Sequence, residues 1–254
     1  MNGGLSLPSP YRVVCLDEVD STNDEAKRLA EGGAPEFTVV WAHAQRRGRG
    51  RRRRSWASPP GNLYLSLVMR PNARPAVAAQ LAFVATLALH DGLRALLRPP
   101  IDLVLKWPND LLLNGRKVSG MLLESAMAAR GAVDWLVIGV GVNVASHPAS
   151  ADFPATSLRA EGFAKVTPED VLEGFARHFR PWVARWRVEG FRPVRTSWLK
   201  AAHGVGEAVT VRLDRERLEG RFADLDETGA LVLALPDGAY QKVTAGEVFF
   251  PEAR

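Results

Sequence analysis

The chain is poor in cysteine and has neither a basic leader nor a long apolar run. Cys15 is the one cysteine in 254 residues, so no internal disulfide can form and a reducing compartment is indicated. The first ten residues lack the charged start and apolar centre of a signal peptide. The longest apolar stretch, residues 76–89, is interrupted by Gln80 and Thr86 and is expected to be too short to span a bilayer. These absences disfavour a secreted or membrane-bound protein and predict a cytoplasmic one.

A net positive charge is absent outside one short tract. The net charge is +5, and seven arginines lie within residues 46–54. Without those seven, the rest of the chain would carry a net charge of −2. A non-specific nucleic-acid binder spreads its basic residues over a face, so this distribution predicts no DNA partner. Hydrophobic residues make up 46% of the chain, which is ordinary for a globular protein with a substantial core.

The arginine tract is expected to be a loop between two strands. It reads Gln45-R-R-G-R-G-R-R-R-R-Ser55-Trp56 and lies between the apolar segments 37–44 and 62–69, whose composition is typical of strands. Gly48 and Gly50 allow the backbone to approach a ligand closely, and guanidinium groups offer paired donors to carboxylate and phosphate oxygens. The tract therefore predicts an anionic ligand at a fixed place. A solvated basic loop or a nucleic-acid patch is the alternative.

The remaining patterns predict a mixed α+β domain followed by a small all-β one. Strands are expected at 11–16, 37–44, 62–69, 101–106, 111–113, 118–124 and 135–144, with Asn114-Gly115 as a hairpin turn. Helices are expected at 21–33, 75–97 and 167–188. After residue 204, short alternating strands at 208–213, 218–225, 230–235 and 240–250 predict a small antiparallel barrel. We therefore expect domains at 1–203 and 204–254.

Three further clusters could carry chemistry. Lys106-W-P-N-D-Leu111 and Arg116-K-V-S-Gly120 together supply lysines, an amide and a carboxylate near strand ends. Such turns are often only turns, but a tryptophan and a proline beside them favour a site. Gly139 and Gly141 lie inside an expected strand, which indicates a bulge or a ligand against the backbone. Ser21-Thr22-Asn23 is either a helix cap alone or a cap whose hydroxyl also binds a small ligand.

Taken together, these clusters resemble those of biotin protein ligases. The matching segments are Asp20-S-T-N-Asp24, Gln45 to Trp56 continuing into Ser58-P-P-G-N-L, Lys106-W-P-N-D, Arg116-K-V-S-G and Gly139-V-G-V-N. They occur in the family's order, and a weaker similarity at Gly246-Glu247 extends the match to nearly the whole chain. The resemblance implies a biotin/lipoate ligase-like catalytic domain, a mixed sheet with helices, and then an SH3-like β-barrel.

The resemblance also implies an activity and a set of site residues. The expected enzyme activates biotin with ATP and Mg²⁺ to biotinyl-5′-AMP and transfers biotin to a lysine of a biotin carboxyl carrier domain. The implied biotin-binding residues are Ser21, Thr22, Asn23, Gln45, Gly48, Arg49, Gly50, Arg51, Lys117 and Gly120. The implied nucleotide-binding residues are Arg49, Arg51, Arg52, Arg54, Trp56, Asn109, Lys117, Gly141 and Asn143. The implied catalytic residues are Arg51, Lys106, Asp110 and Lys117, with no metal ligand from the protein.

Some features depart from the family pattern or leave alternatives open. Arg53 stands where the family usually has glycine, and Arg46 and Arg47 stand where it has small or uncharged residues. Ten residues precede the first expected strand, so the resemblance is to members without an N-terminal DNA-binding domain, and DNA repression is not expected. A homodimer through sheet edges is compatible with the family. The alternatives are a lipoate or octanoate ligase, which shares the catalytic fold, and a nucleic-acid-binding module that uses the tract.

Overall fold

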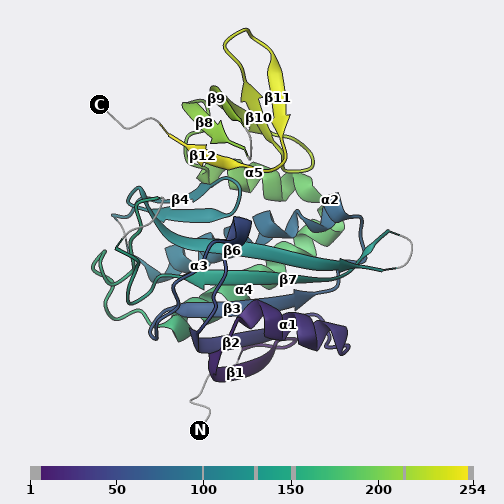
Figure 1. Cartoon of the computed structure of the whole chain (residues 1–254), viewed down its shortest axis with the longest axis vertical. Coiled ribbons are helices and arrows are strands. Elements are labelled where there is room, and N and C mark those ends of the chain that lie inside the picture. The colour runs from purple at the N-terminus through teal and green to yellow at the C-terminus, as the bar shows by residue number, and fades with distance from the viewer. Residues whose placement is uncertain (1–6, 99, 129–130, 150–152, 214–215, 251–254) are drawn as a thin grey trace.

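Two sheets and a set of helices make up the chain in the computed structural model, which describes residues 7–98, 100–128, 131–149, 153–213 and 216–250. The larger sheet forms the body of the molecule, with α1 on one face and α3 and α4 on the other, and the smaller sheet stands at one end of it (Figure 1). The strands of the larger sheet are β1 Arg12–Val19, β2 Thr38–Gln45, β3 Leu63–Met69, β4 Leu103–Lys106, β5 Asp110–Leu113, β6 Arg116–Met127 and β7 Val133–Val142.

The strand order of the larger sheet brings distant motifs together. The order is β1-β2-β3-β7-β6-β5-β4, with β1 and β2 parallel and the other neighbours antiparallel. Ser66 pairs with Gly139, and Gly120 pairs with Gly141. The end of β2, where the arginine tract begins, therefore shares a sheet with the glycines of β7 and the lysines around β5. Asn114 and Gly115 have φ values of 51° and 74° and form the expected hairpin.

Helices cover both faces of this sheet (Figure 1). They are α1 Thr22–Glu31, α2 Pro75–Ala78, α3 Leu81–Leu96, α4 Pro168–Glu189 and α5 Phe191–Ala201. The N-terminus of α4 is a capping box, in which Thr167 and Asp170 each satisfy the other's backbone N–H. The face covered by α3 and α4 holds the main core, whereas a smaller apolar cluster containing Ala26, Val40 and Trp135 lies beneath α1. Burying the smaller cluster anchors α1 and so fixes the residues at its N-terminus.

The segment expected as one helix over 75–97 is divided. Around Ala79 and Gln80 the backbone bonds span three residues, from Gln80 N to Val77 O and from Ala82 N to Ala79 O. The buried Gln80 side chain bonds the Glu227 carbonyl and the Trp186 ring N–H. By length and composition Pro75–Leu96 could cross a bilayer, contrary to our expectation, but 72% of its 18-residue apolar window is buried inside the protein. Of the two pieces, α3 is therefore a core helix, whereas α2 has Ala78 as its buried residue.

The smaller sheet is antiparallel, as expected. Its strands are β8 Ala208–Arg212, β9 Arg217–Leu225, β10 Leu231–Ala234, β11 Tyr240–Val243 and β12 Glu247–Phe249, in the order β11-β10-β9-β8-β12. The strand expected over 240–250 is two strands, since β11 pairs with β10 and β12 pairs with β8. Within the described residues no pairing joins β11 to β12, so barrel closure is not seen. Helix α5, which the sequence pattern did not predict, begins after Gly190 (φ 74°) and supports this sheet.

Candidate active site

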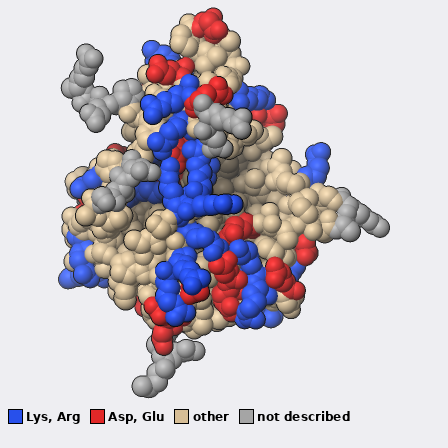
Figure 2. Space-filling model, viewed as in Figure 1, with Lys and Arg blue, Asp and Glu red and all other residues tan. Residues whose placement is uncertain are grey.

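A cavity of about 570 Å³ lies between the larger sheet, the smaller sheet and the arginine loop, residues 46–56. Figure 2 shows the blue lysine and arginine side chains gathered where the two sheets meet. Nearly all the predicted site residues line this cavity: Ser21, Thr22, Asn23, Gln45, Arg49, Gly50, Arg51, Arg54, Trp56, Lys106, Asn109, Asp110, Lys117, Gly120, Gly141 and Asn143. Gly48 and Arg52 do not. The lining runs from Ser21 to Glu247 and Val248 of β12, so residues up to 227 positions apart in sequence share one site.

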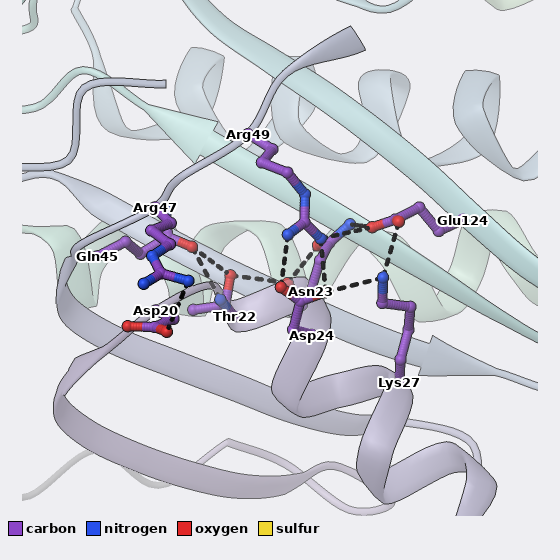
Figure 3. A network of polar contacts seen from close by, with 10 residues as sticks. Asp20, Thr22, Asn23, Asp24, Lys27, Gln45, Arg47, Arg49 and Glu124 are labelled. Carbon is purple, nitrogen blue, oxygen red and sulfur yellow. Dashed lines mark hydrogen bonds and ion pairs between the residues drawn. The ribbon is translucent and has the colours of Figure 1, made fainter. Parts of the chain in front are cut away.

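Polar groups at the start of α1 form one end of the cavity. The backbone N–H and the Oγ1 of Thr22 both donate to Gln45 Oε1, at 2.8 and 3.0 Å. Ser66 Oγ contacts Thr22 Oγ1 at 2.8 Å and Asn23 Oδ1 at 2.6 Å. Ser21 occupies the N-cap position without a side-chain cap bond, and Gln45 accepts from the N–H of Thr22, the first residue of the helix. Figure 3 shows Thr22, Asn23 and Gln45 converging between α1 and the end of β2.

Arg49 crosses the same end of the cavity and is held by acidic groups. Its guanidinium pairs with the Asp24 carboxylate at 2.5 and 2.6 Å and lies 3.5 Å from Glu124 (Figure 3). The hydrogen bonds from Arg49, together with Lys27, lower the pKa of Asp24 to about 2 against the opposing effect of burial. Arg49 therefore fastens the first half of the arginine loop to α1.

Three further loop arginines lie close to carboxylates. Arg46 contacts Asp20 at 2.7 Å, Arg47 lies 3.8 Å from Asp20, and Arg54 contacts Glu247 at 2.6 Å. These ion pairs offset the mutual repulsion of the arginines. Arg53 has φ 58°, in the left-handed region that favours glycine. This φ value explains physically why the family that the sequence resembles usually has glycine at this position.

Glu247 joins the smaller sheet to the arginine loop, and sequence reasoning missed it. Besides Arg54, its carboxylate contacts Arg212 at 2.7 Å and lies 3.9 Å from Arg52. Burial raises the pKa of Glu247, but the hydrogen bonds from Arg54 and Arg212 outweigh this effect and lower it to about 2. The weak similarity at Gly246-Glu247 was the one available signal. Arg52 also donates to the Arg212 carbonyl, which explains why it lies outside the cavity.

A cationic centre occupies the middle of the cavity. Lys117 Nζ lies 2.7 Å from Asp110 Oδ1, and Arg51 donates to Asn109 Oδ1 at 3.1 Å. Burial lowers the pKa of the Arg51 guanidinium. Gly120 pairs with Asp110 across β5 and β6, and a Cβ there would lie 3.1 Å from Lys117 Nζ. The glycine thus leaves room for the lysine and carboxylate to meet beside a ligand.

Lys106 is buried next to this centre. It is 3% exposed, and its Nζ lies 2.9 Å from the centroid of the Phe153 ring. Burial is the main cause that lowers its pKa from 10.5 to about 7, and the nearby Lys117 acts in the same direction, while Asp110 opposes them. Phe153 was another residue that sequence reasoning missed, because the segment around it shows no periodic pattern. The Lys106 amine inside the site therefore has a pKa close to neutral pH.

The two glycines of β7 make space for side chains and not for a bulge. A Cβ on Gly139 would collide with the Asn23 amide, and one on Gly141 would lie 2.6 Å from the Trp56 ring. The pairing of β7 with β6 is regular at both positions, so the bulge interpretation was wrong. Trp56 therefore packs against Gly141 of the sheet and forms one wall of the cavity. Nearby, Asn143 donates to the Thr156 carbonyl at 2.9 Å.

Gly48 serves the loop's own shape. A Cβ there would lie 2.5 Å from the Trp56 carbonyl, and the Trp56 N–H donates to the Gly48 carbonyl at 2.8 Å. The Gly50 N–H likewise donates to the Arg54 carbonyl at 2.8 Å. These bonds close the loop on itself.

Trp107 also lines the cavity, and its ring N–H donates to the Gly229 carbonyl in the smaller sheet.

Comparison with known proteins follows the same division of the chain. Residues 18–200 match the biotin/lipoate A/B protein ligase family, and residues 204–250 match the biotin protein ligase C-terminal domain. The chain is 42% identical over 240 residues to a biotin–[acetyl-CoA-carboxylase] ligase of Paracoccus denitrificans, covering 92% of this chain and 99% of that one. It is 32% identical to the enzyme of that name from Mycobacterium tuberculosis, covering 91% and 86%. The biotin protein ligase of Aquifex aeolicus in complex with biotin and ATP superposes with a TM-score of 0.79 at 28% identity, covering 94% and 97%. The chain therefore belongs to the biotin/lipoate A/B protein ligase family.

Proposed function

We propose that this chain is a biotin protein ligase. Biotin and MgATP would give biotinyl-5′-AMP and pyrophosphate, and biotin would then pass to a lysine of a biotin carboxyl carrier domain. The observation that carries the proposal is a single cavity that joins a polar end, a cationic centre and an aromatic wall. The similarity to ligases of this name, over almost the whole chain, supports the same activity.

The polar end suits the ureido ring of biotin. A ureido group has a carbonyl acceptor and two N–H donors, and Ser21, Thr22, Asn23 and Gln45 offer both donors and acceptors there. Leu65 and Val140 line the same cavity and supply apolar surface for the rest of the ring system. Arg49 and Gly50 would cover the ring from the loop, and Gly48 would hold the loop in shape.

The cationic centre suits the junction between the biotin carboxyl group and the α-phosphate. Arg51 and Lys117 would contact both groups, with Gly120 beside the biotin chain. Arg54, Asn109, Gly141 and Asn143 would bind the nucleotide, and the Trp56 ring would stack or order the loop beside it. Arg52 would contribute through the contact between the loop and the smaller sheet. Mg²⁺ would enter with ATP, held mainly by phosphate oxygens.

In the first reaction, a biotin carboxylate oxygen attacks the α-phosphorus of ATP, and the bond to pyrophosphate breaks. Two anions must come together, and Arg51 and Lys117 offset their repulsion. Lys106 has a pKa close to neutral pH in the free enzyme. It would take up a proton as the phosphates arrive, because nearby negative charge raises an amine's pKa. The closed loop would then keep water from the anhydride.

In the second reaction, a neutral lysine amine of the acceptor attacks the acyl carbon of biotinyl-5′-AMP. The new amide C–N bond forms, the C–O bond to AMP breaks, and AMP leaves with its phosphate charge. The amine must lose a proton, and we assign Asp110 to orient the amine or accept that proton. Its contact with Lys117 keeps the carboxylate beside the reacting centre.

Biotin-dependent exchange of pyrophosphate into ATP tests this proposal, with lipoate in place of biotin as the comparison. We expect exchange with biotin alone. Arg51→Ala and Lys117→Ala should each lower the exchange rate by about 10²–10³, the usual effect of removing one transition-state donor. Arg192→Ala, an exposed helical arginine on α5, is the control and should match the wild type. Exchange with lipoate, or wild-type rates in either site variant, would refute the assignment.

A further inference from the structure

A second cavity adjoins the first from the side of the smaller sheet. Its volume is about 330 Å³. Six residues line both cavities and form the boundary between them: Arg51, Trp107, Pro108, Asn109, Met121 and Leu122. Arg51 and Asn109 are bonded to each other at 3.1 Å. No step assigned above uses this second space, although it reaches the residues proposed to hold the reacting junction.

The far walls of the second cavity are uncharged and mostly small, and Phe83 and Leu123 are the two large apolar residues among them. Ala76, Ala79 and Ala82 come from the α2–α3 segment. Thr228, Gly229, Ala230 and Thr244 come from the smaller sheet. Among the described residues that line this cavity, Arg51 is the single charged one. The cavity opens to solvent, because four of its lining residues are exposed: Ala76, Ala79, Thr228 and Thr244. Figure 2 shows the surface hollowed beside the blue arginine cluster, below the smaller sheet.

We propose that this second cavity, called the channel below, admits the side chain of the acceptor lysine to the activated biotin. The inference rests on the proposed function. Biotinyl-5′-AMP would fill the first cavity, so the nucleophile needs a separate approach to the acyl carbon. The channel ends at Arg51 and Asn109, next to the assigned base Asp110.

The chemistry of the walls suits a lysine in its reactive form. A lysine has a four-carbon apolar stem, which small apolar residues accommodate without a polar penalty. The attacking amine must be neutral. Loss of water at the inner end of the cavity and the positive charge of Arg51 both lower the pKa of an entering ammonium. No carboxylate from the described lining would hold the ammonium in its charged state before it reaches Asp110.

Filling the channel should separate the two half-reactions. Ala79→Trp places a bulky ring in the channel from the α2 side, and Thr244→Trp does so from the smaller sheet. Neither residue lines the first cavity, and both are exposed, so either variant can report if the other folds poorly. Ala95→Trp, an exposed helical alanine of α3 outside both cavities, is the matched control.

The experiment measures biotin-dependent pyrophosphate exchange and, separately, single-turnover transfer from the preformed adenylate complex to a biotin carboxyl carrier domain. We expect both channel variants to keep wild-type exchange and to lose transfer by about 10²-fold, the effect of misplacing a reacting group by about 1 Å. Cleavage of the adenylate by hydroxylamine, a small nucleophile, should remain near the wild-type rate. Ala95→Trp should be unchanged in all three.

Wild-type transfer rates in both channel variants would overturn the inference. A parallel fall in exchange and transfer would also overturn it, because the cavity would then belong to adenylation. If the wild-type protein showed no biotin-dependent exchange at all, the proposed function itself would fail. The two failures are therefore distinguishable.

Discussion

Replacing the buried Lys106 should stabilise the protein in a way that depends on pH. The side chain is 3% exposed, and burial lowers its pKa from 10.5 to about 7. At about 1.4 kcal/mol for each tenfold change in proton affinity, this difference corresponds to about 5 kcal/mol. That amount is a large part of the stability of an ordinary domain. Lys106→Met keeps the stem and removes the charge, so it should recover much of that free energy.

The direction of the pH dependence follows from proton binding. Between pH 7 and pH 10.5 the unfolded chain keeps the Lys106 proton while the folded chain releases it, so wild-type stability rises with pH in this window. Below pH 7 the lysine is charged in both states, and the folded protein bears the full cost. The stability gap between Lys106→Met and the wild type should thus fall from about 5 kcal/mol at pH 6 to about 2 kcal/mol at pH 9, on top of a constant packing difference.

Urea denaturation at several pH values between 6 and 9 measures this gap. Lys165→Met, at an exposed position, is the control and should show no pH-dependent gap. The variant should also be poor in pyrophosphate exchange, since Lys106 flanks the proposed reacting centre. A gap for Lys106→Met that stays constant with pH, or that widens as pH rises, would refute the burial argument.

Two further substitutions test the contacts that shape the site. Glu247→Gln weakens the ion pairs with Arg54 and Arg212. Because charge-assisted hydrogen bonds contribute about 1.5–3 kcal/mol, trypsin should cut within residues 46–56 about tenfold faster in this variant. Biotin with ATP should restore protection, and unchanged cleavage would show that Glu247 does not hold the loop. Gly141→Ala places a methyl group 2.6 Å from the Trp56 ring, so the KM for ATP should rise about tenfold, since overpacking typically costs about 1–3 kcal/mol. Gly174→Ala, where the new contact is an ordinary 3.4 Å, is its control, and a normal KM in Gly141→Ala would refute a nucleotide role for the Trp56 wall.

The smaller sheet contributes specific polar contacts to the site. Glu247 binds the arginine loop, the Gly229 carbonyl accepts a hydrogen bond from Trp107, and the Gly246 carbonyl lies 3.4 Å from Arg51. Two segments of the site, the arginine loop and the segment around Trp107, are thus fastened to residues beyond 225. A substitution in the smaller sheet can therefore change catalysis without touching substrate.

Local features of the chain were readable from its residues alone. Alternating apolar residues marked the strands, Asn114-Gly115 marked a hairpin, and Thr167 with Pro168 marked the start of α4. The motifs at Gln45 to Trp56 and at Lys106 to Asp110 also pointed to residues that share one cavity. The predictions of strands, hairpin and helix start succeeded because each depends on spacing and residue type within one short segment.

Other features depended on how distant segments meet. The partners of the loop arginines are Asp20, Asp24 and Glu247, and no local pattern says which carboxylate faces which guanidinium. The glycines of β7 were interpreted as a bulge or as a place where a ligand lies against the backbone, whereas the close approach comes from Asn23 and Trp56. Strand order, ion pairing and the second cavity are properties of packing between segments, so only the folded chain decided them.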